Sequence, residues 1–111
     1  MHPNQLLVLL TIRHLQPTSI NRVVVQLDWP RSNVVYRLYG DYNYDKPGLI
    51  ANGLVAVNRG QMGTMRLTEA GQAAIAGYAL IREGGRYRVG KSIVSPMIGA
   101  FLILPGGISY E

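Results

Sequence analysis

The chain has 111 residues, enough for one hydrophobic core and too few for two, so we expect a single domain. It has no cysteine, which excludes disulfides and thiolate zinc sites and favours a reducing compartment such as the cytoplasm. Apolar residues make up 48% of the chain, as in folded proteins, and a net charge of +5 favours polyanionic partners, either nucleic acid or an anionic membrane surface.

Neither apolar run of the sequence fits an export signal or a membrane span. The run at residues 6–10 has no basic segment before it and no small-residue cleavage site after it. The run at residues 93–104 contains Pro96 and Gly99 and is shorter than the roughly 20 residues that a spanning helix needs. We therefore expect a cytoplasmic protein that does not enter a membrane.

The first third of the chain predicts three helices. Asn4 is a good N-cap for the first helix, and Pro17 ends it. Thr18 or Ser19 caps the second helix, in which apolar residues recur at i, i+3, i+4 and i+7, and Pro30 suits the first position of the third. The predicted helices cover residues 5–15, residues 20 to about 28, and residues 31 to about 39.

The middle of the chain predicts a loop, a hairpin and a fourth helix. Residues 40–48 are rich in turn-forming residues and form the loop, and Leu49, Ile50 and Leu54 form one helical turn after it. Alternating residues predict strands at 54–58 and 64–67, joined by a turn that contains Gly60 and Gly63. Thr68 then caps a helix from residue 69 to about residue 82, which Gly84 and Gly85 end.

The last 26 residues have a less regular pattern. Residues 86–94 are strand-like, Pro96 interrupts them, and residues 97–104 suit either a strand or a helix. We therefore expect a first domain at residues 1–83 and a C-terminal extension of open structural type at residues 84–111.

The order of these elements, together with the segment Leu67-Thr68-Glu69-Ala70-Gly71, resembles the winged helix-turn-helix. The segment is similar to the junction between wing and helix in bacterial and archaeal regulators, including the multiple-antibiotic-resistance type and the phenolic-acid-decarboxylase regulator type. The resemblance covers roughly residues 6–82. It implies an α+β fold with a three-helix core, a two-stranded wing and a following helix, and with a short C-terminal extension beyond them.

In this resemblance the third helix enters the major groove of DNA and the wing reaches the adjacent phosphates or minor groove. If Val35 and Leu38 pack inward, the opposite face of the helix carries side chains that pair with bases or phosphates, with Val34 at its edge touching a thymine methyl. Residues 1–66 carry seven of the eleven basic residues. The expected DNA-binding residues are Arg31, Ser32, Asn33, Val34, Tyr36, Arg37, Arg59, Gln61, Thr64 and Arg66.

The sequence departs from the family pattern at two places. The loop at residues 40–48 stands where the common regulators continue one longer helix. The family also commonly dimerises through long terminal helices, whereas the end of this chain is interrupted by glycine and proline. The apolar residues 93–104 are instead the expected surface of a homodimer, and packing against the first helix is the alternative.

These features predict sequence-specific binding of double-stranded DNA by a prokaryotic or viral transcription regulator that acts by occupying its site. We expect no catalytic activity, no cofactor and no metal, since His2 and His14 have no cysteine or carboxylate cluster near them in the sequence. The main alternative is a winged-helix module that binds another protein, because a fold does not fix a function. Tyr36, Tyr39, Tyr42 and Tyr44 either pack around the loop or stack on unpaired bases.

A third interpretation is nucleotide binding, because residues 85–92 match the phosphate-loop pattern G-x-x-x-x-G-K-[ST]. That loop wraps its backbone N–H groups around phosphates between a buried strand and a helix. Here the bulky side chains of Arg86, Tyr87 and Arg88 stand where small residues are usual, and twenty further residues are too few for a parallel α/β domain. We therefore interpret this segment as a basic, strand-like surface.

Overall fold

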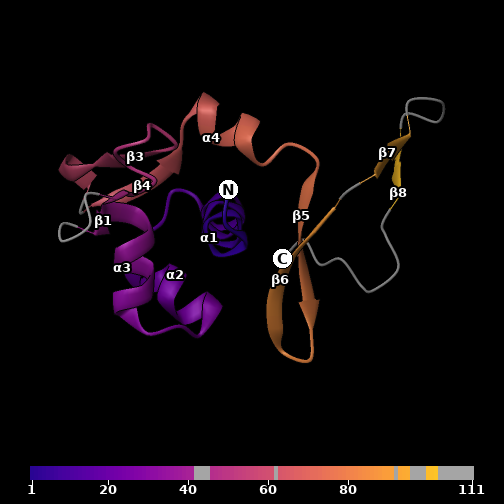
Figure 1. The fold of residues 1–111 in the computed structure, drawn as a ribbon, viewed down its shortest axis with the longest axis horizontal. Coiled ribbons are helices and arrows are strands. Elements are labelled where there is room, and N and C mark those ends of the chain that lie inside the picture. Colours follow the sequence, from indigo (N-terminus) through magenta and orange to yellow (C-terminus); the bar gives the residue numbers. More distant parts are fainter. Residues whose placement is uncertain (42–45, 62, 92, 96–99, 103–111) are drawn as a thin grey trace.

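The protein has an α+β fold in a computed structural model that describes residues 1–41, 46–61, 63–91, 93–95 and 100–102 (Figure 1). Within these residues each strand pairs with the next strand along the chain, and each pair is antiparallel. In chain order the elements are α1 (Pro3–Leu15), α2 (Ile20–Leu27), α3 (Arg31–Tyr39), β1 (Gly40–Asp41), β2 (Lys46–Pro47), β3 (Val55–Asn58), the 3-10 turn η2 (Arg59–Gln61), β4 (Thr64–Leu67), α4 (Glu69–Ala74), β5 (Tyr78–Glu83), β6 (Arg86–Lys91), β7 (Ile93–Ser95) and β8 (Ala100–Leu102).

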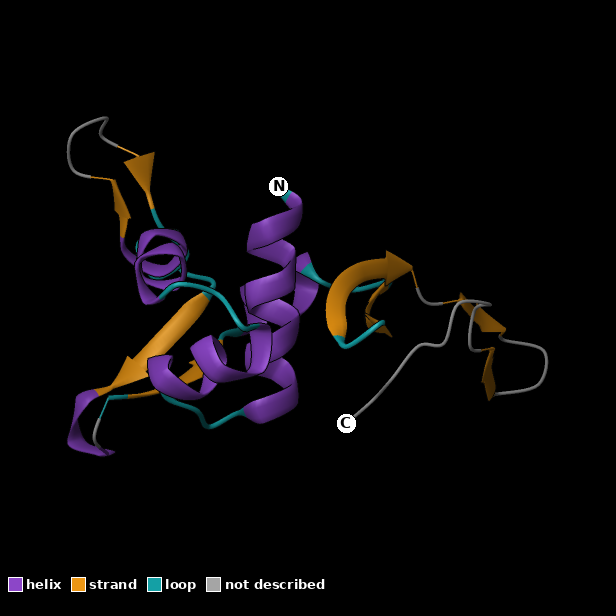
Figure 2. Cartoon of the chain, turned by 90° about the horizontal axis from the view of Figure 1, so that it is seen from below, coloured by secondary structure: helices purple, strands orange, loops and turns teal. Residues whose placement is uncertain are grey.

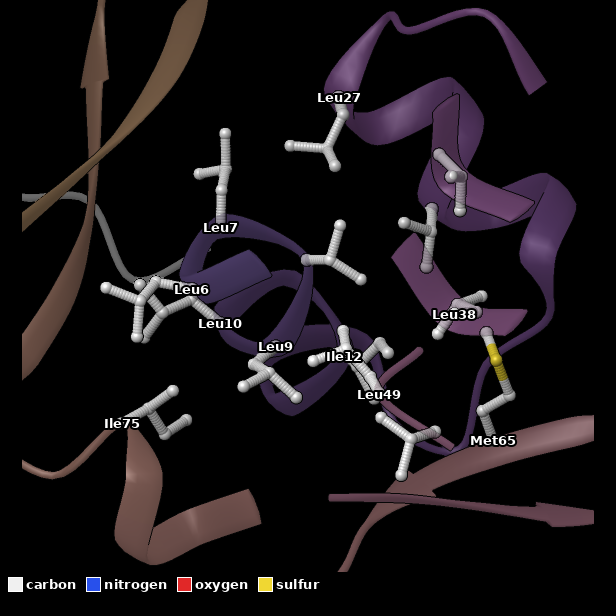
Figure 3. Packing of buried hydrophobic residues seen from close by; sticks show 14 of the residues in the cluster. Leu6, Leu7, Leu9, Leu10, Ile12, Leu27, Leu38, Leu49, Met65 and Ile75 are labelled. Carbon is white, nitrogen blue, oxygen red and sulfur yellow. The ribbon is translucent and has the colours of Figure 1, made fainter. Parts of the chain in front are cut away.

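Helix α1 is the centre of the fold. Its residues 6–12 are all buried, so the helix is covered on every side rather than along one stripe. Helices α2 and α3 and the β3–β4 hairpin lie on one side of α1, and the β5–β6 hairpin lies on the other (Figures 1 and 2). Figure 3 shows Leu27, Leu38 and Met65 on the first side and Ile75 across the helix from them. The apolar run at residues 6–10 therefore lies in a helix, as predicted, and that helix belongs to the core.

The three predicted helices form close to their predicted bounds. The first begins two residues early, because the His2 side chain, rather than that of Asn4, accepts the hydrogen bond of the first turn from the Asn4 N–H at 3.0 Å. Ser19 caps α2 by accepting from the Arg22 N–H at 3.3 Å, and Asp28 ends α2 in the left-handed conformation at φ 55°. None of the helices in the described part of the chain is both long and apolar enough to cross a membrane.

The loop predicted at residues 40–48 contains a short hairpin, β1–β2, at the end of α3. Tyr42 and Tyr44 lie outside the described residues. Two glycines close this insertion tightly, because a Cβ at Gly48 would overlap the carbonyl oxygen of Leu38 and one at Gly40, where φ is +86°, would overlap that of Lys46. Chain residues 49–54 then form turns, and the next strand begins at Val55.

The predicted β3–β4 hairpin forms, and it is held against the connection between α1 and α2. Val55 faces Leu67 and Asn58 faces Thr64 across the two strands. The Leu67 N–H donates to the Oε1 atom of Gln16 at 2.9 Å, which fixes the end of β4 to the residue that follows α1. Thr68 caps α4 as predicted, by accepting a hydrogen bond from the Gly71 N–H at 3.0 Å.

The helix predicted from residue 69 to about residue 82 is wrong over its second half. Helix α4 ends at Ala74, and the chain turns at Gly77, where φ is +83°, into strand β5. Gly84 and Gly85 are not a helix end but the two-residue turn of the β5–β6 hairpin, and both have positive φ. The hairpin crosses the domain boundary predicted after residue 83, so residues 84–91 belong with β5 and with the core that α1 forms.

Candidate nucleic-acid interface

An open hollow of about 290 Å³ lies where α2, α3 and the β3–β4 hairpin meet. It brings together the two ends of α3, the first residues of α2 and the tip of the hairpin. No acidic side chain of the described residues lines it. The lining residues are Ser19, Ile20, Asn21, Arg31, Tyr39, Val57, Arg59 and Gly63.

Arg31 is placed in this hollow by the start of α3. Pro30 precedes the helix with an extended backbone, so that Arg31 is its first residue and is exposed. The guanidinium of Arg31 donates a hydrogen bond to the side-chain oxygen of Asn21 in the first turn of α2. This contact holds the positive charge of Arg31 between the first turns of α2 and α3. The free backbone N–H groups of these turns also favour an anion.

Arg59 reaches the same hollow from the tip of the β3–β4 hairpin. It begins η2, and the Asn58 Oδ1 atom accepts a hydrogen bond from the Gly60 N–H at 3.0 Å, which shapes the turn around Arg59. Its side chain is exposed. The hollow therefore joins a basic residue of α3 to a basic residue of the hairpin.

The exposed face of α3 differs from the prediction at one residue. Val34 is 0% exposed and belongs to the core, so it is not at the edge of the outer face, and the prediction that it contacts DNA is wrong. Val35, which we expected to pack inward, is only half-buried. Val34 and Leu38 are one helical turn apart and share the inner side, so Leu38 packs inward as predicted and Val34 takes the inward position expected for Val35.

The other predicted residues of α3 lie toward solvent. Ser32, Asn33 and Tyr36 are exposed, and Arg37 is half-buried. The guanidinium carbon of Arg37 lies 5.2 Å from the centre of the Tyr36 ring, a cation–π contact that steadies both side chains at the surface.

The hairpin residues predicted to bind DNA are not all on one face. Successive residues of a strand point to opposite faces, and Val57 of the hollow is opposite Met65, so Thr64 and Arg66 belong to the other face of β4. Arg66 is exposed there, away from Arg59. For Gln61 the structure gives the backbone, in η2, and its side chain is outside what is described.

Tyr39 and Asn21 line the hollow but were not among the residues predicted from the sequence to bind DNA. Tyr39 lies two turns after Arg31 on the same edge of α3 and is 47% exposed. Its helical spacing from Arg31 was available in the sequence, but we assigned the tyrosines near the loop to packing or base stacking. Asn21 was not identifiable, because only the crossing of α2 and α3 brings it to Arg31.

The segment that matches the phosphate-loop pattern is mainly a strand. Residues 86–91 form β6 and pair with β5 along their whole length, from Glu83 opposite Arg86 to Tyr78 opposite Lys91. Their backbone is extended rather than wrapped around a phosphate-sized space, and Ser92 lies outside the described residues. This bears out the interpretation of the segment as strand-like. Among the described residues no group of three or more His, Asp or Glu side chains is placed to hold a metal ion.

The chain matches no protein-family model, no curated protein and no solved structure. The case for its function therefore rests on the sequence and on the geometry of the hollow.

Proposed function

We propose that this chain binds double-stranded DNA as a winged helix-turn-helix regulator, with α3 in the major groove and the β3–β4 hairpin on the neighbouring backbone. The observation that carries the proposal is that Arg31 of α3 and Arg59 of the hairpin line one hollow, to which the described residues contribute no acidic side chain. A helix in the major groove and a hairpin on the DNA backbone must belong to one continuous protein surface. Arg31 and Arg59 lie on such a surface.

The residues of α3 that lie toward solvent divide into two chemical roles. Asn33 has an amide that pairs with adenine, and Arg37 has a guanidinium that pairs with guanine. Ser32 and Tyr36 carry hydroxyl groups that donate to phosphate or to base edges. We assign base contacts to this outer face and phosphate contacts to the hollow.

Within the hollow, Arg31 and Arg59 are the phosphate ligands that we propose. Tyr39 adds a hydroxyl group at the other end of α3, and Asn21 orients Arg31. Arg66 points from the opposite face of the hairpin, so we propose that it contributes to binding only through its charge. The proposal therefore gives Arg59 and Arg66 different roles, although the sequence predicted both as DNA-binding residues.

The homodimer stays a prediction and is part of the proposal, with each copy on one half of a palindromic site. The segment expected to form it, residues 93–104, is described only in β7 and β8. Sedimentation of the free protein measures its oligomeric state directly, and a monomer at micromolar concentration would remove this part of the proposal.

The proposal is tested by fluorescence anisotropy of a labelled duplex titrated with the protein at two salt concentrations. Each phosphate neutralised by an arginine releases counterions, so Arg31 and Arg59 in the two copies of a homodimer, about four contacts, predict a loss of affinity of roughly 100-fold between 50 and 200 mM salt. An affinity that does not change over this interval would contradict DNA binding. Selection of bound sites from random duplexes then gives the target sequence.

A further inference from the structure

Helix α2 carries an apolar side chain at the centre of its solvent-facing side. Val23 and Leu27 are buried and hold the inner side of the helix in the core. Val25 lies on the opposite side and is 79% exposed, the largest exposed fraction of any large apolar side chain in the described part of the chain. The outer side of a surface helix normally carries polar residues. Burial of Val25 against another molecule is therefore favourable.

An open hollow of about 330 Å³ lies beside Val25, between α2 and the last residue of α1. Its exposed surface is mainly apolar, and Leu15 of α1 supplies one wall. The other lining residues are Asn21, Arg22, Val25 and Gln26 of α2. The outer side of α2 therefore combines an apolar projection with an apolar recess next to it.

Two charged residues stand at equal distances from Val25. Arg22 comes three residues before it and Asp28 three residues after it, so the helical rise places each about 4.5 Å from Val25 along the axis. Both side chains are exposed, and the described residues supply no hydrogen bond or salt bridge to either of them. The apolar centre is thus flanked by one positive and one negative charge, and both are available to another molecule.

Both charges have the wrong sign for the dipole of their own helix. Arg22 lies in the first turn of α2, where free N–H groups favour an anion, and Asp28 caps the other end, where free carbonyl groups favour a cation. A neighbouring helix that runs in the opposite direction would bring its N-terminal end beside Asp28 and its C-terminal end beside Arg22. The charges of α2 therefore complement a second, antiparallel α2.

We propose that α2 is a self-association surface, on which a second copy of this chain packs its own α2 in the antiparallel direction about Val25. A two-fold axis at Val25 brings Arg22 of each copy level with Asp28 of the other, and it places each Val25 beside the hollow of the other copy. This surface differs from residues 93–104, the segment expected from the sequence at the homodimer. The inference goes beyond the proposed function, because the contact forms without DNA.

Disulfide formation tests the centre of this contact. The chain has no cysteine, so a single introduced thiol cross-links only to the same residue of another copy. In a mild oxidant we expect Val25→Cys to form the dimer at least tenfold faster than Ala73→Cys, which places a thiol at an exposed position of α4. Each rate is divided by the rate of the same thiol with a small soluble disulfide, which corrects for differences in exposure and reactivity.

Arg22→Cys is the control for the register of the two helices. In the antiparallel pair the two copies of residue 22 lie about 9 Å apart along the helix axis, which is beyond the reach of a disulfide. Arg22→Cys should therefore cross-link at least tenfold more slowly than Val25→Cys, although both residues are exposed on the same helix.

Charge variants in the Val25→Cys chain test the complementarity. Arg22→Glu puts a like charge level with Asp28 of the other copy and should slow cross-linking at least fivefold. Asp28→Asn alone should also slow it, because Arg22 loses its partner, whereas Asp28→Asn added to Arg22→Glu removes the repulsion and should raise the rate again. Asparagine tolerates the left-handed conformation of residue 28. Arg22→Glu suits the dipole of its own helix, so its melting temperature should not fall.

Each remaining outcome is decisive. Cross-linking at residue 25 that is no faster than at residue 73 or residue 22 would overturn the inference. A rate that Arg22→Glu does not change, or that Asp28→Asn lowers further in the Arg22→Glu chain, would overturn it as well. If the protein sediments as a dimer without preferential cross-linking at residue 25, the homodimer of the proposed function stands and this surface does not. These measurements contain no DNA, so their failure leaves the proposed DNA binding intact.

Discussion

Thr18 and Met65 exchange two backbone hydrogen bonds, from the Met65 N–H to the Thr18 carbonyl at 2.6 Å and from the Thr18 N–H to the Met65 carbonyl at 3.1 Å. Both residues are fully buried. Because Thr18 immediately precedes the cap of α2, this pair fixes the β3–β4 hairpin relative to the first turn of α2. That turn contains Asn21, which holds Arg31, so the geometry of the proposed DNA-binding surface follows from this connection.

Gln16→Ala should weaken the same connection. It removes the acceptor for the Leu67 N–H at a half-buried position, so we expect a loss of about 1 kcal/mol in the free energy of unfolding. Urea denaturation followed by circular dichroism measures it. Gln16→Glu keeps an oxygen acceptor and is the matched control; equal losses in the two variants would show that the side-chain hydrogen bond is not responsible.

Gly48→Ala should destabilise the fold by at least about 2 kcal/mol, because its Cβ would overlap the backbone of Leu38 at the end of α3. Gly60→Ala, in the tip of the β3–β4 hairpin, is the comparison. A Cβ there would meet only the Asn58 Oδ1 atom at 3.4 Å, and the change should be within about 0.5 kcal/mol. Similar melting temperatures for both variants would contradict the tight closure of the β1–β2 insertion.

Val34→Ala should cost about 2 kcal/mol of stability, as expected for a fully buried side chain that loses two methyl groups. Val35→Ala, at a half-buried position, should cost clearly less. Thermal unfolding of the two variants side by side makes the comparison. If Val35→Ala were the more damaging change, the inward face of α3 would be the one that the sequence predicted.

The ion pair between Glu83 and Arg88 predicts a local dependence on pH. Hydrogen bonds and the charge of Arg88 lower the pKa of Glu83 below its usual value, and both side chains are exposed. Because the pKa of Glu83 is lowered in the folded state, the ion pair stabilises the hairpin at pH values above the ordinary glutamate pKa. This stabilisation is lost as the pH falls through the lowered pKa. NMR titration should give a midpoint for Glu83 that rises in Arg88→Gln and stays unchanged in Lys91→Gln, which removes a cation at the far end of the hairpin. An unchanged midpoint in Arg88→Gln would contradict the pair.

The elements with strong local signals were predictable from the sequence. Capping residues and helical spacing located α2, Pro30 located the start of α3, and the alternation around Val55 and Val57 located the strands of the β3–β4 hairpin. Thr68 was also identified correctly as the cap of α4. A Cβ at Gly71 would overlap the carbonyl oxygen of Leu54, so a small residue is required where α4 approaches the preceding turn.

The remaining features depend on contacts between distant residues. Residues 75–83 have enough apolar residues for a helix, and only pairing with β6 makes Tyr78–Glu83 a strand. The two glycines at 84 and 85 were a usable hairpin signal that we interpreted as a helix end. Whether Val34 or Val35 is the core residue depends on how α3 crosses α1 and α2. The sequence of α3 by itself does not determine that crossing.

The proposed DNA-binding surface is tested most directly by reversing the charge of one arginine on each face of the same hairpin. Arg59→Glu and Arg66→Glu change the net charge equally, and both side chains are exposed, so the melting temperature should stay within a few degrees in each variant. Anisotropy with a selected duplex should show at least a tenfold loss of affinity for Arg59→Glu and less than about a threefold loss for Arg66→Glu. Equal losses, or a larger loss for Arg66→Glu, would contradict the assignment of the hollow between α3 and the hairpin as the DNA-binding surface.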